Sequence, residues 1–409
     1  MSIDWQQGLP VLRGEGIILR EPRIADADAL FARLTSRSVT RFLSTPPDSA
    51  AGFGRFIGWV QHERQQGRHL CYAIVPDGAA DAVGLIQMRE IEPGFGTAEW
   101  GFAMAEAFWG SGVFMTSARL SVDFVFRHVG VHRLEARASV KNGRGNGVLQ
   151  KLGAVPEGVL RRSFDNGAQA TDQVLWSLIA DDWLAASPDQ PYVLDHPVTS
   201  APETEWPASL EGHDALWRRG LPELRGEHVL LRELEADDAG PLTGHFSHAD
   251  VGRYISPPPV SLEAFGRFVT WAHKQRELGS YFCYAVIPEG EQHPVGIFQI
   301  HRLEPTFSIA EWGFVFAKPF WGTGVFVRSA RVLLAFIFDT LKVKRLEARA
   351  MADNLRANAV LRKLGAVEEG RLRRSFLLGG QYHDDVLWSL LDSDWSRHRG
   401  TGPVAPDHP

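Results

Sequence analysis

Two short segments of the chain combine aromatic residues with a pair of glycines in a spacing that suits phosphate binding. The segments are Phe108-Trp109-Gly110-Ser111-Gly112-Val113-Phe114 and Phe320-Trp321-Gly322-Thr323-Gly324-Val325-Phe326. Each one joins a predicted strand to the start of a predicted helix. Two glycines allow a tight backbone turn, and the first N–H groups of a helix, at the positive end of its dipole, hold phosphate without a basic side chain. The alternative is a tight turn that binds nothing.

Other familiar catalytic patterns are missing from the sequence. The two glycine segments lack the Gly-Lys-Ser/Thr of a mononucleotide P-loop and the third glycine of a dinucleotide fingerprint, which argues against an ATPase or a dehydrogenase. Among the 15 histidines, only His196 and His408 occupy corresponding positions of the sequence repeat described next. Chemistry common to both copies therefore uses no histidine, and we expect neither a histidine-based triad nor a bound metal.

The chain contains two similar copies of one sequence. Trp312 follows Trp100 by 212 positions, and the same offset aligns residues 5–183 with residues 217–395 without a gap. A period near 200 residues is far longer than the roughly 20 to 50 residues of solenoid repeats, so each copy should be a complete domain. The predicted organisation is an N-terminal domain at 1–184, a proline-rich linker at 185–214, a C-terminal domain at 215–396 and a flexible tail at 397–409.

Composition and charge exclude several partners. The chain has 43 Lys and Arg against 49 Asp and Glu, a formal charge of −6, with no long run of either sign. We therefore expect no nucleic-acid partner and no binding to anionic membranes. The longest apolar stretch, 332–338, is far shorter than the roughly 18 residues of a membrane span, and the N-terminus does not resemble a signal peptide. With Cys71 and Cys283 expected to be buried free thiols, these features predict a cytoplasmic protein.

Hydrophobic periodicity predicts the same order of elements in each copy. In the first copy the predicted strands are 16–20, 70–75, 83–91, 98–104, 134–140, 159–164 and 174–178. The predicted helices are 26–34, a second one ending near residue 67, 113–129 and 144–152. The order β-α-α-β-β-β-α-β-α-β-β describes an α/β (α+β) fold: a twisted, mixed, mostly antiparallel sheet with helices on both faces.

With this order of elements, a set of short motifs makes each copy resemble the GNAT-superfamily N-acetyltransferases of the RimJ/RimL type. The motifs are Leu19-Arg20 and Leu231-Arg232 at the opening, Trp-Gly-x-Gly after the fourth strand, Asn142 and Asn354 after the fifth, and Leu152-Gly153-Ala154 and Leu364-Gly365-Ala366. The resemblance implies acetyl-CoA as acyl donor, with its pyrophosphate on the amides of 109–114 or 321–326. Its pantetheine arm would lie along the end of the fourth strand, at Phe102, Ala103 and Met104 or at Phe314, Val315 and Phe316, facing Asn142 or Asn354.

Acetyl transfer to an amine requires a base, and a donor for the oxyanion. Glu99 and Glu311 open the fourth strand, where similar enzymes often keep a carboxylate for this purpose; the alternative is a carboxylate held in a salt bridge. The oxyanion donor would be a backbone N–H near Ala103 or Val315. The family's Asn-x-x-Ser has no serine here, because Gly145 and Ala357 occupy that position, so this site supplies no acid for the leaving thiolate.

The resulting hypothesis is direct acetyl transfer, in a ternary complex, to a protein N-terminal α-amine or a small-molecule amine. A rival is an acyl-CoA-binding regulatory or scaffold protein with one or both halves inactive. The second copy should be the more competent, because three glycines in 141–147 weaken a helix start that is better formed in the second copy. The loops 44–47 and 256–259 are the predicted acceptor loops. We expect a monomer with pseudo-dimeric halves, or a homodimer.

Overall fold

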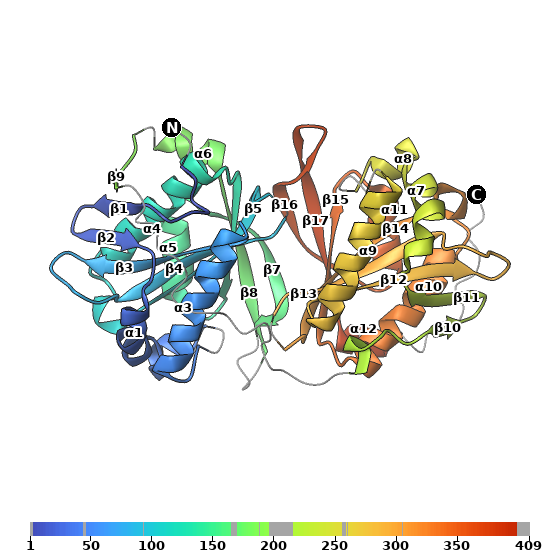
Figure 1. The fold of residues 1–409 in the computed structure, drawn as a ribbon, viewed down its shortest axis with the longest axis horizontal. Coiled ribbons are helices and arrows are strands. Elements are labelled where there is room, and N and C mark those ends of the chain that lie inside the picture. Colours follow the sequence, from blue (N-terminus) through green and yellow to red (C-terminus); the bar gives the residue numbers. More distant parts are fainter. Residues whose placement is uncertain are drawn as a thin grey trace. The chain divides into compact units, whose positions relative to one another are not determined.

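The computed structural model describes residues 3–43, 46–92, 94–164, 170–187, 189–195, 216–255, 259, 261–304 and 306–398. The chain divides after residue 208 into two compact units, each holding one copy of the sequence (Figure 1). Within the described parts of the chain, no helix is both long and apolar enough to cross a membrane.

The first unit contains every element that the sequence predicts, together with short elements that it misses. Its strands are β1 (Val11–Gly14), β2 (Ile17–Arg20), β3 (His69–Pro76), β4 (Gly84–Glu90), β5 (Thr97–Met104), β6 (Arg133–Ser139), β7 (Val155–Phe164), β8 (Thr171–Ile179) and β9 (Val193–Asp195). Its helices are α1 (Ala27–Leu34), α2 (Arg37–Thr40), α3 (Ala50–Gln65), α4 (Val113–Phe124), α5 (Gly143–Lys151) and α6 (Ala180–Ala186). One π-helical segment, Val125–Val129, continues α4.

The second unit repeats the order. Its strands are β10 (Leu224–Gly226), β11 (Val229–Glu233), β12 (Tyr281–Pro288), β13 (Gly296–Arg302), β14 (Ile309–Phe316), β15 (Arg345–Met351), β16 (Val367–Leu378) and β17 (Gln381–Leu391). Its helices are α7 (Ala239–Phe246), α8 (Ala249–Gly252), α9 (Leu262–Glu277), α10 (Val325–Ala335), α11 (Leu355–Lys363) and α12 (Asp392–His398). The long helices α3 and α9 begin at equivalent serines, whose hydroxyls accept the N–H of Gly52 and of Ala264, each at 3.1 Å.

Each sheet is mixed and mostly antiparallel, as the sequence predicts. In the first unit the strands follow the order β9-β1-β2-β3-β4-β5-β6-β8-β7, and β5 with β6 is the parallel pair. In the second unit the order from β10 through β15 to β17 and β16 is the same, with β14 and β15 parallel.

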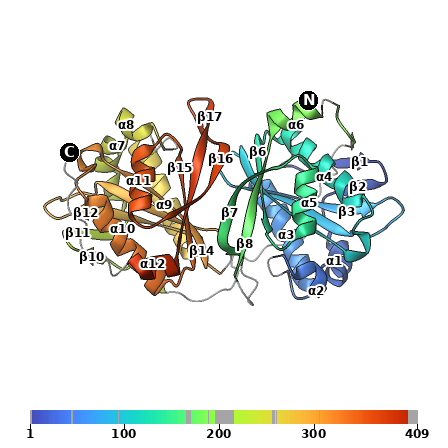
Figure 2. The ribbon, with the colours of Figure 1, turned by 180° about the vertical axis from the view of Figure 1, so that it is seen from behind.

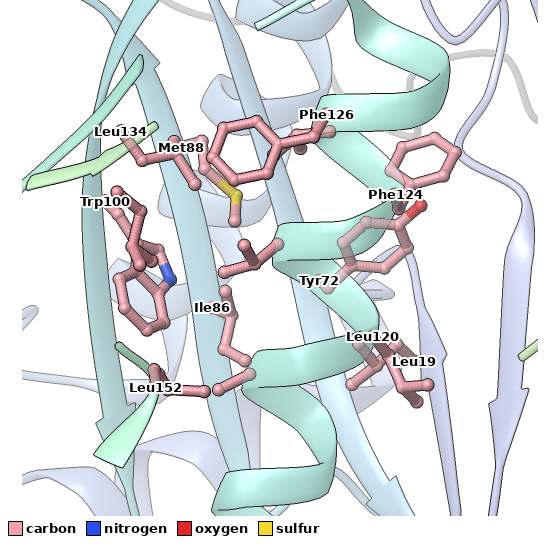
Figure 3. Close-up of a cluster of buried hydrophobic side chains, with 14 of the residues drawn as sticks. Leu19, Tyr72, Ile86, Met88, Trp100, Leu120, Phe124, Phe126, Leu134 and Leu152 are labelled. Carbon is pink, nitrogen blue, oxygen red and sulfur yellow. The ribbon is translucent and has the colours of Figure 1, made fainter. Parts of the chain in front are cut away.

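Alternate residues of each strand face two different helix layers. Along β3, Tyr72 packs with the cluster under α4, whereas Cys71 packs with the cluster under α1 and α3. Figure 3 shows Tyr72, Ile86 and Trp100 of the sheet against Leu120 and Phe124 of α4. Figure 2, from behind, shows α4 and α5 on this side of the first unit. Successive side chains of a strand point to opposite faces of the sheet. Because helices cover both faces, nearly every residue of these strands is apolar.

Both cysteines are free and buried, as the sequence predicts. Burial raises the pKa of the Cys71 and Cys283 thiols well above the usual range, so the reactive thiolate is suppressed. Both thiols pack in the apolar layer on the α1/α3 and α7/α9 side of their sheets.

The start of the predicted linker is part of the first unit. Residues 193–195 form β9, which pairs with β1, and the Tyr192 side chain is buried in the core. Arg127 Nη2 also donates to the Ser187 carbonyl at 2.5 Å. The described part of the predicted linker therefore includes structure that contacts the rest of the first unit, through β9 and through the apolar side chains of Tyr192 and Leu194. Residues 196–214 and most of the tail lie outside the described residues, and the domain limits at 184, 214 and 396 stay predictions.

A buried histidine should make the protein sensitive to acid. His69 on β3 is 4% exposed, and its Nε2 lies 3.2 Å from Gln87 Oε1. Burial, assisted by the charge of Arg89, lowers the pKa of His69 to about 4. The unfolded chain, where a histidine has a pKa of about 6.5, then binds more protons between pH 6.5 and 4, so stability is complete above this window and falls as pH decreases. We expect a loss of about 2 kcal/mol from this group between pH 7 and pH 5.

Urea unfolding of the whole chain at pH 7 and pH 5 measures this loss. The variant His69→Tyr carries the residue of the second copy, Tyr281, and should lose less stability than the wild type over the same interval. His293→Tyr, at an exposed position, is the control and should behave like the wild type. Equal losses in His69→Tyr and the wild type would contradict the assignment.

Candidate active site

The parallel strand pair of each unit separates after three residues. In the first unit β5 pairs with β6 over Thr97 to Glu99, opposite Arg133 to Glu135. Beyond Glu99, β5 continues beside β4, while β6 continues beside β8. Among the described strands none pairs with this edge of β5 from residue 100 to residue 104. The second unit separates in the same way after Glu311, so both predicted bases lie where the two strands begin to diverge.

A buried ion cluster holds this point in place. Arg133, fully buried, contacts Glu135 Oε1 through its Nε at 3.1 Å and Glu157 Oε2 through its Nη2 at 2.6 Å. The second unit has the same arrangement, in which Arg345 contacts Glu347 at 2.9 Å and Glu369 at 2.6 Å. Buried charges are costly unless they are paired, so the cluster constrains the register of the strands it joins.

The backbone of β5 turns alternate N–H groups toward the open edge. The Ala105 N–H donates to the Val83 carbonyl, which fixes the phase of the strand. Because amides alternate along a strand, the Ala103 N–H also points toward β4, whereas those of Phe102 and Met104 point toward the open edge. The corresponding bond in β14 joins Ala317 to Val295, so the N–H groups at the open edge there belong to Phe314 and Phe316. An oxyanion donor near Ala103 or Val315 stays a prediction, and the N–H groups at the open edge next to these residues are those of Phe102, Met104, Phe314 and Phe316.

Both glycine loops have the backbone conformation that their sequence predicts. Gly110 and Gly112 have φ of 80° and 88°, and the corresponding glycines of the second unit, Gly322 and Gly324, have φ of 76° and 82°. These left-handed conformations favour glycine. The second glycine is the residue before α4 or α10, so the loop ends at the N-terminus of a buried helix. In each loop the hydroxyl between the glycines, of Ser111 or Thr323, bonds the carbonyl three residues earlier and tightens the turn.

The loop tryptophans join the strand end to the helix that follows the fifth large strand. Trp109 Nε1 donates to the Met104 carbonyl at 3.0 Å, and Arg144 lies over the indole ring at 4.4 Å. In the second unit Trp321 Nε1 donates to the Phe316 carbonyl at 2.9 Å, and Arg356 lies over its ring at 4.6 Å. Sequence reasoning missed these arginines. Their signal was an arginine two residues after Asn142 and Asn354 in both copies.

The two predicted asparagines cap helices. Asn142 Oδ1 accepts the Gly145 N–H at 2.9 Å, and Asn354 Oδ1 accepts the Ala357 N–H at 3.1 Å. The same glycine and alanine stand where a family serine was expected, and their N–H groups now close the first turns of α5 and α11. Capping uses the side-chain oxygen and leaves the amide N–H₂ as the group that each asparagine can direct at a ligand.

A cavity of about 1100 Å³ connects these parts in the second unit. It is larger than typical small-molecule pockets, which are about 300 to 1,000 Å³. Of the predicted site residues, its wall contains Phe314, Val315, Phe316, Trp321, Gly322, Thr323, Gly324, Phe326 and Asn354. Val325 packs into the core instead, and Glu311 lies outside this wall. In the first unit, the side chains of Phe102 and Phe114 meet at 4.5 Å between ring centroids, as Phe314 and Phe326 do at 4.6 Å, and Val113 packs against the core.

The two predicted bases have different surroundings. Glu99 is 27% exposed, pairs with Arg89, and lies 3.8 Å from Arg137. Burial raises its pKa, but the two arginines outweigh burial, so the pKa of Glu99 is lowered. Glu99 therefore takes part in a salt bridge, and a carboxylate whose pKa is lowered is a weak proton acceptor.

In the second unit a histidine replaces the first of these arginines. His301 occupies the position of Arg89 and stands directly opposite Glu311 in the register of β13 and β14. Arg349 remains, with its Nε 3.7 Å from Glu311 Oε1. The structure thus brings a titratable imidazole beside the second glutamate but not beside the first.

Loss of the indole N–H should weaken the loop of the second unit. The substitution Trp321→Phe keeps an aromatic ring under Arg356 but removes the bond to the Phe316 carbonyl, and we expect coenzyme binding to weaken about fivefold to tenfold. Isothermal titration with CoA measures the change. Trp271→Phe, at an exposed position of α9, is the matched control. A Trp321→Phe affinity within twofold of the wild type would show that this bond does not order the loop.

Part of each predicted acceptor loop lies outside the described residues. Residues 44 and 45 of one acceptor loop and 256–258 of the other lie outside the described residues, as do 165–169 of the first unit's last hairpin. Within the described ranges, no group of three or more His, Cys, Asp and Glu side chains is arranged to hold a metal ion.

A mixed sheet that opens beside a glycine loop at a helix N-terminus is the architecture of an acetyltransferase of the GNAT class. The family model of the acetyltransferase (GNAT) domain matches residues 17–155 and 228–367. The chain belongs to this family, with one GNAT domain in each unit, and is an N-acetyltransferase.

Known proteins of similar sequence match about one copy of this chain. The ribosomal protein uS5-alanine N-acetyltransferase of Escherichia coli is 26% identical over 45% of this chain and 98% of its own length. The spermidine N(1)-acetyltransferase of Escherichia coli is 25% identical over 42% of this chain and 92% of its own length. The solved structure of Mycobacterium smegmatis RimJ in complex with CoA-disulfide is 22% identical, with a TM-score of 0.40, over 46% of this chain and 98% of that one.

Proposed function

We propose that this protein transfers the acetyl group of acetyl-CoA to a primary amine by direct attack in a ternary complex. The observation that carries the proposal is the cavity of the second unit, which runs from the glycine loop to the open edge of β14. The loop amides suit a pyrophosphate, and the strand edge suits a pantetheine amide chain, which pairs with a strand as a peptide does.

The chain supplies an oxyanion site and leaves the thiolate without an acid. As the amine nitrogen bonds to the carbonyl carbon, the N–H of Phe314 or Phe316 can donate to the developing oxyanion. The C–S bond then breaks and the sulfur leaves as thiolate. A thiol like that of cysteine has a pKa of about 8.5, so departure near neutral pH does not require a strong acid. This agrees with Gly145 and Ala357 standing where the family has a serine.

We assign the base to Glu311 first and to Glu99 only second. Glu99 is neutralised by two arginines, whereas Glu311 faces His301, which can pass a proton to solvent. The amine loses its proton to Glu311, directly or through a water molecule, before or during attack. This ordering agrees with the expectation that the second copy is the more competent.

The charges beside the base favour an acceptor that is not a polycation. Arg137 and Arg349 lie within 4 Å of Glu99 and Glu311, and Arg89 pairs with Glu99. A polyamine would bring several positive charges toward these guanidinium groups, whereas a peptide with one α-amine brings only one. Of the acceptors used by the two named relatives, a protein N-terminal amine therefore fits this chain better than spermidine does. We place the reaction in the cytoplasm, as the composition and the free thiols indicate, with the chain acting as a monomer of pseudo-dimeric halves or as a homodimer.

Release of CoA thiol from acetyl-CoA, measured with a panel of N-terminal peptides and small amines including spermidine, tests the proposal. Turnover should depend on the amine and should yield an acetylated product by mass spectrometry. Tight CoA binding without turnover of any amine would instead support the rival, an acyl-CoA-binding regulatory protein.

A further inference from the structure

The two glycine loops differ in the charged residues around them. Arg328, in the first turn of α10, lies four residues after Gly324, and the first unit has Thr116 at this position. Lys318, just before the second loop, replaces Glu106 of the first. Both residues line the cavity of the second unit. The two copies share the glycines of the loop, whereas the charged residues beside the loop differ between the copies.

Arg328 is folded back over the loop. A Cβ atom added at Gly324 would lie 2.8 Å from Arg328 Nη1, so the guanidinium is in contact with the loop backbone. Arg328 Nε is buried, and within the described residues it has no hydrogen-bond partner. A buried guanidinium nitrogen without a partner is unfavourable, and an anion bound at the loop would satisfy it.

The charged residues next to Arg328 do not cancel the positive charge that it adds at the glycine loop of the second unit. Lys318 Nζ contacts Asp250 Oδ2 at 2.5 Å, so this pair is nearly neutral. Glu106 of the first unit receives a hydrogen bond from Ser38, which is an uncharged partner. One substitution changes the charge in the opposite direction. The second unit has Asp353, on the far wall of its cavity, where the first unit has Lys141. Asp353 precedes α11 and is not part of the glycine loop.

We propose that Arg328 is a phosphate-binding residue of the second unit and that the two units bind CoA with unequal affinity because the first unit lacks it. The inference rests on the proposed function. A guanidinium binds phosphate oxygens through parallel charged hydrogen bonds that threonine cannot form. The second unit is then the half of the chain that loads CoA first.

Reciprocal exchange of the two residues tests this inference by titration calorimetry of the full-length chain. With the first loop disabled by Gly110→Val, Arg328→Thr should weaken CoA binding about tenfold, and Arg328→Lys should weaken it less. With the second loop disabled by Gly322→Val, Thr116→Arg should strengthen binding to the first unit by several fold. Arg267→Thr, an exposed charge on α9, is the control and should change nothing.

Dephospho-CoA, which lacks the 3′-phosphate, identifies the group that is bound. An equal loss with CoA and dephospho-CoA in Arg328→Thr would place Arg328 on the pyrophosphate, and a loss with CoA alone would place it on the 3′-phosphate. Binding of both ligands within twofold of the parent chain would overturn the proposal, as would a Thr116→Arg first unit that binds no better. Absence of CoA binding in the wild type would refute the proposed function itself, a result distinct from binding that ignores Arg328.

Discussion

Replacing Gly322 with valine in a chain that already carries Gly110→Val should lower kcat/KM for acetyl transfer by about a thousandfold. Gly322 has a φ of 76°, and no atom lies within 4 Å of the position that a Cβ would take. The substitution therefore causes no clash and acts through the backbone, because a β-branched residue strongly disfavours the left-handed conformation. The loop would rearrange, and several N–H groups that face the phosphate would be lost together.

The single variants and a remote glycine separate this effect from simple destabilisation. Gly110→Val alone should leave most of the activity, because we expect the second unit to be the more competent. Gly290→Val provides the matched control, since Gly290 also has a positive φ, 89°, and nothing within 4 Å of its Cβ position, but lies in the turn after β12 and does not itself line the cavity. If Gly290→Val and Gly322→Val reduce activity equally, the loop has no special role.

Glu311→Gln should lower kcat by about a hundredfold or more, while CoA affinity stays the same, because a general base contributes roughly that factor. The glutamate lies at the point where β14 and β15 separate, outside the wall of the cavity, so its removal should leave the coenzyme in place. Glu99→Gln should have a much smaller effect, because two arginines already lower the pKa of Glu99. Steady-state kinetics with calorimetry on the same samples distinguishes kcat from binding.

Exchange of the facing residues tests why the two glutamates differ. His301→Arg gives the second unit the residue of the first, and the added positive charge should make Glu311 a weaker base and slow turnover about threefold to tenfold. Arg89→His makes the reverse change in the first unit and should raise its contribution. A Glu311→Gln enzyme as fast as the wild type would remove the base from this position, and the residues facing it would then be irrelevant to catalysis.

The sequence was most informative where a local rule decides the structure. The glycine pairs require positive φ, and Gly110 and Gly322 have it. The continuous apolar run 70–75 predicts a strand, and the structure buries this strand, β3, on both faces. Proline content predicts a spacer after residue 184, and it carries no signal for the pairing of β9 with β1 or for the burial of Tyr192.

Contacts between residues that are distant in the chain were invisible to sequence reasoning. Arg144 and Arg356 reach the loop tryptophans only because α5 and α11 begin beside the open strand edge. The strand register places Arg89 opposite Glu99 and His301 opposite Glu311, and only this register relates them to the predicted bases.

The sequence by itself determined that one fold occurs twice, its order of elements, its family and the position of both glycine loops, because these depend on periodicity and on backbone preferences of single residues. The tertiary structure decided which amides face the open strand edge, which glutamate is neutralised and that Arg328 folds over its loop. These are properties of pairing between strands and of side chains in space, and no local pattern encodes them. Two copies of one sequence could therefore keep the same fold while a few substitutions, Arg89 to His301 and Thr116 to Arg328, made their sites chemically different.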